Sequence, residues 1–391
     1  MSRNTSGAIP FHRPSIGAEE EEAVLRVLRS GWLTTAGEAR AFEEELAHFV
    51  GARHAISVSS ATAGLHLALE AAGVRPGSRV ITTPYTFTST AEVIRYLGAD
   101  PLFVDVREDD LNIDPAEIGR ALEREGIDAV SAILPVHLGG HPCAMEAIRE
   151  LAGDRIPVVE DAAHALPAAR AGRALGTWGT AGVYSFYATK TITTGEGGMV
   201  VTDDAELARR MTVMRLHGID REVWDRYTSP RPSWQYEVVE AGFKYNLPDI
   251  LAALGRVQLR RADGFARRRR EIASIYHDRL ADREYLELPP ACAESSWHLY
   301  VVRIRPERLR VGRDEFIARL ADLGIGTSVH YIPLHLMPYY RDRYGLKPED
   351  FPVSLDAYTR AFSLPIYPGL DDGEVERVAE AVRSVGDGAP A

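Results

Sequence analysis

Cysteine is scarce in this sequence, since Cys143 and Cys292 are the only two cysteines among 391 residues. They lie far apart in the chain, and neither stands in a spacing typical of a metal site. The scarcity argues against a disulfide framework and against a structural zinc site. We therefore expect no bound metal and a reducing compartment, the cytoplasm.

The sequence also lacks long apolar runs and an excess of positive charge. No stretch reaches the length of a membrane span, and the N-terminal MSRNTSGAIPFHRPSIG has no apolar signal-peptide core. The formal net charge of −11 argues against a sequence-independent grip on nucleic acid, which requires a basic face. We expect neither a membrane nor a nucleic acid as partner, whereas a small anionic ligand remains compatible because one local cluster of amides and cations can bind it.

What the sequence does contain is an alternation of strand-like and helical segments. Runs rich in Val and Ile are repeatedly followed by helical patterns, which is typical of an α/β fold with a mostly parallel sheet covered on both faces. The strand-like runs are residues 54–57, 80–82, 101–106, 129–135, 156–160 and 182–186.

A long helical pattern over residues 248–280 follows, and it carries a run of arginines that we interpret as a solvated helix face. The remainder mixes strand patterns with helical ones, which indicates a smaller α+β domain. The expected strands are residues 298–304 and 326–330, and the expected helices are 313–323 and 373–385. We predict a large domain over residues 1–260 and a small C-terminal domain over residues 261–391.

Ligands of such sheets bind beyond the carboxyl ends of the strands, and three of these places carry chemistry. The first is the stretch of small residues that includes Ser60, Ala61 and Thr62, between a strand and a helix. Small residues let the backbone approach a ligand, and the free amides of a helix N-terminus attract an anion such as phosphate. Ser and Thr are also ordinary helix caps, so this segment alone leaves both interpretations open.

The second place is the end of the strand that runs into Glu160, Asp161 and His164. Neighbouring strand side chains point to opposite faces, so we expect only one of the two acids to face the site. A carboxylate there suits a permanent positive partner, for example a protonated ring nitrogen. The alternative is an acid that caps the next helix.

The third place holds Ser185 and Lys190, at and just beyond a strand end and followed by a glycine cluster that lets the chain turn. If all three places meet, they offer a phosphate cradle, a carboxylate and a lysine amine. This set matches pyridoxal 5′-phosphate, whose phosphate must be anchored, whose ring nitrogen must stay protonated and whose aldehyde forms a Schiff base with lysine. The lysine is then also the base that moves a proton.

Five segments of the sequence together resemble a known family. They are SSATAGLHLAL, PYTFTSTAEVI, EDAAHA, SFYATKTITTGEGG and GFKYNLPDILAALG, and the likeness extends from IPFHRPSIG to SLPIYPGL, over nearly the whole chain. In order and spacing they are similar to the DegT/DnrJ/StrS family of nucleotide-sugar aminotransferases. The resemblance implies a fold-type I PLP-dependent transferase, with the architecture of aspartate aminotransferase.

The resemblance also implies roles for single residues. Lys190 would form the Schiff base, Asp161 would pair with the pyridine nitrogen, and His164 would lie near the phenolic oxygen of the cofactor. Phe87 would stack on the ring, although core packing is its ordinary alternative. The phosphate would be held by Ser60, Ala61, Thr62 and Ser185.

Further residues correspond to family positions at the substrate and at a second subunit. Asn246 would reach the phosphate from a partner chain, so the resemblance implies a homodimer with the active site at the subunit interface. The segments GWLTT and SVHYIPLH correspond to regions that contact the nucleotide-sugar, although a histidine there can equally be packed in the core. The expected substrate contacts are Trp32, Thr34, His330, Tyr331 and His335.

The expected reaction follows from Lys190, because family members with histidine at this position dehydrate sugars instead of transaminating them. The resemblance implies a ping-pong transfer from L-glutamate to a UDP- or dTDP-linked 4-keto-sugar. Amination at C3 or of a keto-cyclitol uses the same cofactor residues and stays open as an alternative. A non-catalytic regulatory protein on the same fold is the alternative from a different class.

Overall fold

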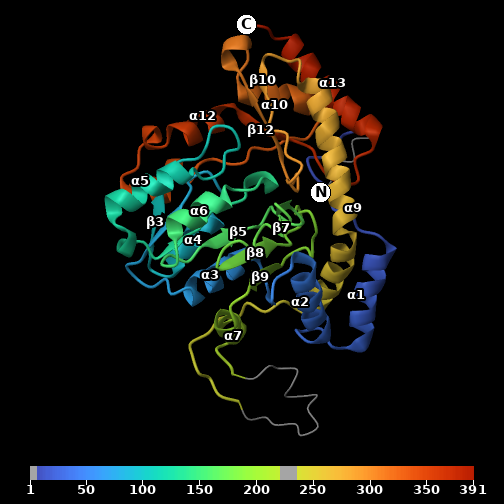
Figure 1. Ribbon diagram of the computed structural model, residues 1–391. Helices are drawn as coiled ribbons and strands as arrows, with labels where there is room; N and C mark the ends of the chain where they lie inside the picture. Colours follow the sequence, from blue (N-terminus) through green and yellow to red (C-terminus); the bar gives the residue numbers. More distant parts are fainter. Residues whose placement is uncertain (1–6, 221–235) are drawn as a thin grey trace.

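The computed structural model describes residues 7–220 and 236–391, which form a large α/β part and a smaller part at one end (Figure 1). The centre of the large part is a mixed sheet in the order β1-β9-β8-β5-β4-β2-β3. Two isolated parallel bridges, Ile133 with Val158 and Val136 with Asp161, join the segments of β4 and β5. Every strand runs in one direction except β9. The strands are β1 (His54–Val58), β2 (Arg79–Thr82), β3 (Asp100–Phe103), β4 (Ala132–Ile133), β5 (Val159–Asp161), β8 (Ala181–Ser185) and β9 (Gly198–Thr202).

Helices cover both faces of this sheet, as the apolar strands require. One face packs against α3 (Ala61–Ala71), α4 (Ser89–Tyr96) and α7 (Ala205–Met214). The other packs against α2 (Gly37–Val50), α5 (Pro115–Glu125) and α6 (Met145–Ala152). The prediction of an α/β fold with a mostly parallel sheet is confirmed. The small hairpin of β6 (Ala169–Arg170) and β7 (Arg173–Ala174) lies outside the sheet.

Helix α3 lies unusually close to the sheet at Gly64. A Cβ atom placed on Gly64 would lie 2.7 Å from Cγ1 of Val183, closer than real Cβ atoms approach, and 3.0 Å from Cγ2 of Val200. Glycine therefore lets the helix start directly above the strand ends. This packing fixes the N-terminus of α3 at the carboxyl edge of the sheet.

The smaller part has its own core around the antiparallel sheet β10-β11-β12. Its elements are β10 (Leu286–Glu287), β11 (Tyr300–Ile304), β12 (Ala361–Leu364), α10 (Arg313–Asp322) and α13 (Asp372–Asp387). The expected strand over 326–330 is wrong, because this segment makes only one antiparallel bridge, between Ser328 and Ser363. Helices α11 (Pro338–Tyr344) and α12 (Pro352–Arg360) lie against the large part.

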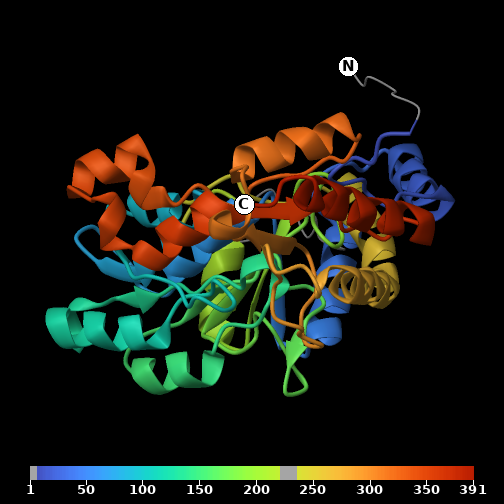
Figure 2. The ribbon, with the colours of Figure 1, turned by 90° about the horizontal axis from the view of Figure 1, so that it is seen from above.

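The 32-residue helix α9 (Asp249–Leu280) connects the two parts (Figures 1 and 2). Its first half packs against α1 (Ala18–Ser30) and α2, and its second half contributes Ile272 and Tyr276 to the smaller core. The expected domain boundary at residue 260 falls inside this helix. The division into two domains at that residue stays a prediction.

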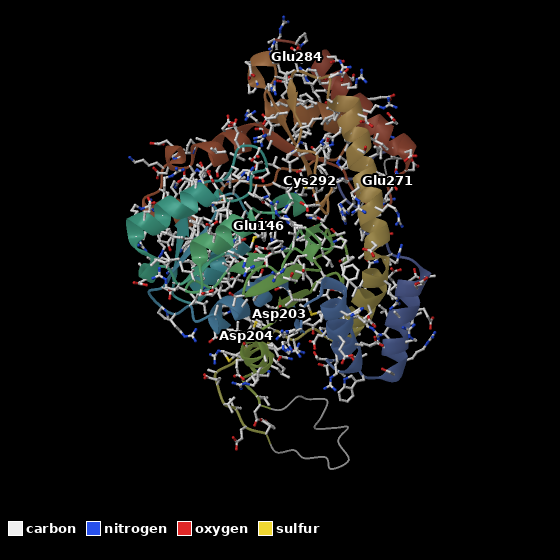
Figure 3. All side chains as sticks on the ribbon, in the orientation of Figure 1. Glu146, Asp203, Asp204, Glu271, Glu284 and Cys292 are labelled. Carbon is white, nitrogen blue, oxygen red and sulfur yellow. The ribbon has the colours of Figure 1, made fainter. Side chains whose placement is uncertain are left out.

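The arginine run on α9 is only partly a solvated face, which corrects the expectation. Arg268 pairs with the exposed Glu271, labelled on α9 in Figure 3. Arg269, in contrast, is 1% exposed and donates from Nη1 to the carbonyls of Trp297, His298 and Ile366. The helix is covered on this side by the segments that enter β11 and leave β12, so a guanidinium can bind their free carbonyls.

The cysteines and the apolar character of the helices can be examined in the residues that the structure describes. Cys143 is buried and Cys292, on the connection between β10 and β11, is partly exposed, and both are free thiols (Figure 3). In residues 7–220 and 236–391, no helix combines the length and apolar character needed to cross a bilayer.

Candidate active site

A cavity of about 540 Å³ lies at the carboxyl edge of the central sheet. Its walls come from segments that follow β1, β2, β4, β5 and β8, and from the smaller part through residues before β11 and after β12. The cavity therefore lies between the two parts of the molecule, where a doubly wound sheet binds ligands. Ten of the expected site residues line it: Ser60, Ala61, Thr62, Phe87, Asp161, His164, Ser185, Lys190, His330 and Tyr331.

The N-terminus of α3 provides one end of the cavity. Ser60 caps the helix, because its Oγ accepts a hydrogen bond of 3.1 Å from the amide of Ala63. The amides of Ala61 and Thr62 lie in the first turn and have no acceptor within the helix. They face the cavity beside Ser185, at the end of β8. Free amides and the helix dipole make this end suitable for a phosphate.

The backbone at Gly198 lies very close to the start of α3 at this anion site. A Cβ atom on Gly198 would lie 2.7 Å from the amide nitrogen of Ala61, so only glycine fits beneath the start of α3. Nearby Gly195 has φ of +84°, in the left-handed region that glycine readily adopts. The glycine cluster after Lys190 therefore combines a turn with a close backbone contact.

Asp161 faces the cavity, and Glu160 points to the other side of β5. Thr90 donates a hydrogen bond of 2.8 Å to Oδ2 of Asp161, and the amide of Ala163 donates one of 3.1 Å to Oδ1. Burial raises the pKa of Asp161, and the hydrogen bonds and nearby Lys190 oppose this effect. The prediction that only one of the two acids faces the site is confirmed.

Lys190 lines the cavity five residues beyond the end of β8 and is partly buried there. Burial lowers the pKa of Lys190 to about 8, although the nearby Asp161 carboxylate acts in the opposite direction. At pH 7 a lysine with this pKa is about one tenth neutral amine, far more than a lysine with the ordinary pKa of 10.5. Only the neutral amine can attack a carbonyl carbon, so the cavity prepares Lys190 as a nucleophile.

Asn246 and Thr34 lie in a different place. Both line a surface pocket with Arg40 and Lys244. The side-chain amide of Asn246 donates a hydrogen bond of 2.6 Å to Oγ1 of Thr35, and Lys244 binds the amide oxygen. Trp32 belongs to the same connection between α1 and α2 and does not line the cavity. Within one chain these residues do not join the other site residues.

His335 also lies outside the cavity, in contrast to His330 and Tyr331. Its side chain is completely buried, and its ring packs against Phe351 with 4.8 Å between centroids. We therefore correct the expectation of a substrate contact, because His335 is a core residue. His330 does line the cavity, and its Nδ1 lies 2.8 Å from Oγ of Ser363.

Reasoning from the sequence did not identify several other residues of the cavity wall, among them Phe11, His12, Glu196 and His298. Nε2 of His12 lies 3.1 Å from the carbonyl of Ala188, which is 176 positions away. His298 contacts the ring of His164 at 4.4 Å between centroids. No local sequence pattern predicts contacts between residues so far apart in the chain. For Glu196 alone, its position in the glycine cluster after Lys190 was an available signal.

Comparison with known proteins agrees with this geometry. The family described as the DegT/DnrJ/EryC1/StrS aminotransferase family matches residues 14–383. The chain is 45% identical to the spore coat polysaccharide biosynthesis protein SpsC of Bacillus subtilis, over the full length of both proteins.

Solved structures are similar over the same length. The Helicobacter pylori aminotransferase PseC, involved in pseudoaminic acid biosynthesis, is 29% identical, with a TM-score of 0.90 over 98% of this chain and 100% of that one. The sugar aminotransferase Spr1654 of Streptococcus pneumoniae, described as putative, is 30% identical in its PLP form, with a TM-score of 0.89 over 98% and 99% of the two chains.

This chain belongs to the DegT/DnrJ/EryC1/StrS aminotransferase family. Its fold is that of fold-type I PLP-dependent aminotransferases, and the expectations of an enzyme that aminates a sugar and of PLP as cofactor are confirmed. The cavity itself fits the cofactor, because it combines free amides at a helix N-terminus, the carboxylate of Asp161 and the amine of Lys190. These are the three kinds of group that PLP requires.

Proposed function

We propose that this enzyme transfers an amino group from L-glutamate to the keto group of a sugar linked to UDP or dTDP, in two half-reactions. The observation that carries the proposal is the presence of Lys190 and Asp161 in one cavity with the N-terminus of α3. When bound there, PLP supplies an electron sink and a carrier for the amino group. Lys190 is the covalent anchor, and Asp161 holds the ring nitrogen protonated.

Lys190 also moves the proton. Its pKa of about 8 lets Nζ take a proton from the substrate carbon and return it near neutral pH. Asp161 keeps a carboxylate beside the positive ring nitrogen, and a cation bound there offsets the cost of burying that carboxylate. Phe87 lines the cavity and is 57% exposed, so its ring is available for stacking on the cofactor.

Neutral polar side chains in the cavity support a sugar as the acceptor. Burial lowers the pKa values of both His12 and His330 to about 4, so both imidazoles are uncharged at neutral pH. Uncharged rings with one donor and one acceptor nitrogen suit hydroxyl groups. The preference for C4 and for a nucleotide-linked sugar rests on the family resemblance; amination at C3 or of a keto-cyclitol is the alternative.

We further propose a homodimer in which Asn246, Trp32 and Thr34 serve the cavity of the partner chain. The support is that Asn246 and Thr34 share a surface pocket and do not line the cavity of their own chain. Mixing inactive Lys190→Ala protein with inactive Asn246→Ala protein, after dissociation and reassociation, should restore activity. Each mixed dimer then has one site with both residues intact. Failure to restore activity from reassociated dimers would contradict the shared site.

Absorption spectra test the reaction directly. Protein loaded with PLP should show a visible band that L-glutamate bleaches and that one member of a panel of UDP- and dTDP-4-keto-sugars restores. The member that restores the band is the substrate. A band that glutamate leaves unchanged would overturn the proposed donor, and a bleached band that only a 3-keto-sugar or a keto-cyclitol restores would decide for the alternative.

A further inference from the structure

The N-terminal segment over residues 9–12 runs from the smaller part to the cavity. Backbone pairing fixes its start, because the amide of Ile9 donates to the carbonyl of Gly324 at 2.9 Å and the carbonyl of Ile9 accepts from the amide of Gly326 at 2.8 Å. Ile9 is 1% exposed and belongs to the core of the smaller part. Three residues later, His12 lines the cavity. Anchoring so close to His12 holds its ring in place, as a specific ligand contact requires.

The two nitrogens of the His12 ring have different surroundings. Nε2 lies 3.1 Å from the carbonyl oxygen of Ala188. A carbonyl oxygen can only accept a hydrogen bond, so Nε2 carries a proton. Burial, together with the positive charges of Arg269 and Lys190, lowers the pKa of His12 to about 4, so the ring is neutral at pH 7. A neutral imidazole with its proton on Nε2 has a lone pair on Nδ1.

Nδ1 of His12 is therefore a hydrogen-bond acceptor. No group in the described ranges 7–220 and 236–391 donates to it, and the atom is not buried. The buried Arg269 does not bind it either, because Nε and Nη2 of Arg269 have no partner and Nη1 donates to backbone carbonyls. Since His12 lines the cavity, its lone pair is available to a ligand there.

The two substrates of the proposed reaction differ in what they can donate to this atom. L-glutamate has two carboxylates, which only accept at neutral pH, and its single donor is the amine that is transferred. A sugar retains hydroxyl groups, each of which can donate. His12 lies close to the reacting centre, because Ala188 precedes Lys190 by two residues and the charge of Lys190 acts on the His12 ring. The sugar bears the reacting carbon, so its hydroxyls are better placed for Nδ1 than the nucleotide.

We propose that His12 is a specificity-determining residue of the sugar half-reaction, whose Nδ1 accepts a hydrogen bond from a hydroxyl group of the keto-sugar. This inference rests on the proposed function. The bond from Nε2 to Ala188 fixes the tautomer, so the ring offers an acceptor to the cavity. L-glutamate gains nothing from this acceptor. The two half-reactions share one cavity but depend on His12 to different extents.

Replacement of His12 by Gln tests this role. An amide N–H at the end of the Gln side chain can reach the Ala188 carbonyl in the place of Nε2, but Gln has no acceptor in the place of Nδ1. The absorption of the bound cofactor follows each half-reaction separately, first with L-glutamate and then with the keto-sugar that restores the wild-type band. The glutamate half-reaction should stay within about twofold of the wild type, and the apparent Kd of the keto-sugar should rise roughly tenfold. His48→Gln is the matched control, because His48 is exposed on α2 and does not line the cavity.

Analogues that lack one hydroxyl group identify the contact by binding alone. The amino-sugar nucleotide that the wild type forms, and its deoxy analogues, bind to the pyridoxamine 5′-phosphate form without further reaction, so calorimetry gives their Kd. One deoxy analogue should bind the wild type roughly tenfold more weakly than the parent compound does, whereas His12→Gln should bind the two alike. His12→Asn is the second variant, because its amide oxygen can take the place of Nδ1. It should bind the parent compound with nearly wild-type affinity.

The outcomes separate this inference from the proposed function. If the wild type aminates a keto-sugar but no deoxy analogue distinguishes it from His12→Gln, the contact is overturned and the aminotransferase assignment stands. The specificity role is also overturned if His12→Gln slows both half-reactions equally, or if His12→Asn binds the parent compound as weakly as His12→Gln. Should His12→Gln not fold, His12→Asn decides alone, and its failure to distinguish the deoxy analogue overturns the role. Wild-type protein that aminates no keto-sugar would instead contradict the proposed function itself.

Discussion

Two neighbouring carboxylates on β5 show how the two faces of the central sheet differ. Glu160 is completely buried and accepts hydrogen bonds from the amides of Gly176 at 2.8 Å and Gly179 at 2.6 Å. Nε2 of His137 lies 2.9 Å from the same carboxylate. On the other face, Asp161 accepts bonds from Thr90 and Ala163 and borders the cavity.

The comparison shows how the surroundings of two carboxylates, Glu160 and Asp161, give them different functions. The oxygens of Glu160 are occupied by the protein, which satisfies a buried charge and binds the loop after β7 to the sheet. The carboxylate of Asp161 is buried with fewer partners, and its raised pKa expresses that cost. A positively charged ligand removes the cost. Glu160 is therefore expected to serve stability, and Asp161 to serve binding and catalysis.

The largest effect is expected from replacing Lys190, the cation that lines the same cavity as Asp161. Lys190→Ala should lower the turnover number by at least about 10³-fold, because both the covalent anchor and the proton carrier are lost. The melting temperature should stay close to that of the wild type, because the side chain faces the cavity. Lys190→Arg keeps a positive charge and should be equally inactive. Substantial turnover in either variant would contradict the assigned role.

The next largest effect is expected for Asp161→Asn, which breaks the functional side of the comparison. The turnover number should fall roughly 10²-fold to 10³-fold, since the ring nitrogen loses its charge partner. Stability of the cofactor-free protein should not decrease, because a neutral amide replaces a carboxylate whose burial is costly. Steady-state kinetics and denaturant unfolding measure the two parts. A destabilised but fully active variant would reverse the comparison.

The next prediction concerns Glu160→Gln, which disrupts the hydrogen bonds of the structural carboxylate. An amide nitrogen would face the backbone N–H groups of Gly176 or Gly179, so the free energy of unfolding should fall by about 2–3 kcal/mol. Urea unfolding measures this loss. The folded fraction should still bind PLP with nearly wild-type affinity. A stable variant that fails to bind PLP would show that Glu160 contributes to the site.

The smallest effect is expected from pH alone. The folded-state pKa of Lys190, about 8, is below its ordinary value of 10.5, so the neutral amine that attacks PLP increases as pH rises through 8. The rate of PLP capture should increase severalfold between pH 7 and pH 9, measured by stopped-flow absorbance. Between the two pKa values the unfolded chain binds more protons, so stability should also rise with pH there. A midpoint near pH 10 would show that burial does not act on Lys190.

The sequence predicted which residues meet because strand ends of a mostly parallel sheet share one edge. Strand position alone was enough to bring Ser60, Asp161 and Ser185 together with Lys190. The family resemblance added Phe87, and the structure places it in the same cavity.

Reasoning from the sequence failed where partners are distant along the chain. The reversed strand β9 was not predicted, because a strand's direction depends on its pairing with β1 and β8. Arg269 and His335 were misinterpreted for a similar reason, because the segments that bury them come from elsewhere in the chain. The contact of His12 with Ala188 likewise follows only from the folded chain.

Chemical mapping of the cofactor attachment tests the central claim most directly. Wild-type protein loaded with PLP is reduced with borohydride, digested and analysed by peptide mass spectrometry. The account predicts the reduced pyridoxyl group on the peptide that contains Lys190 and not on Lys244 or Lys347, the other lysines of the chain. A label elsewhere, or no label on Lys190 at full loading, would contradict the assignment of the active site.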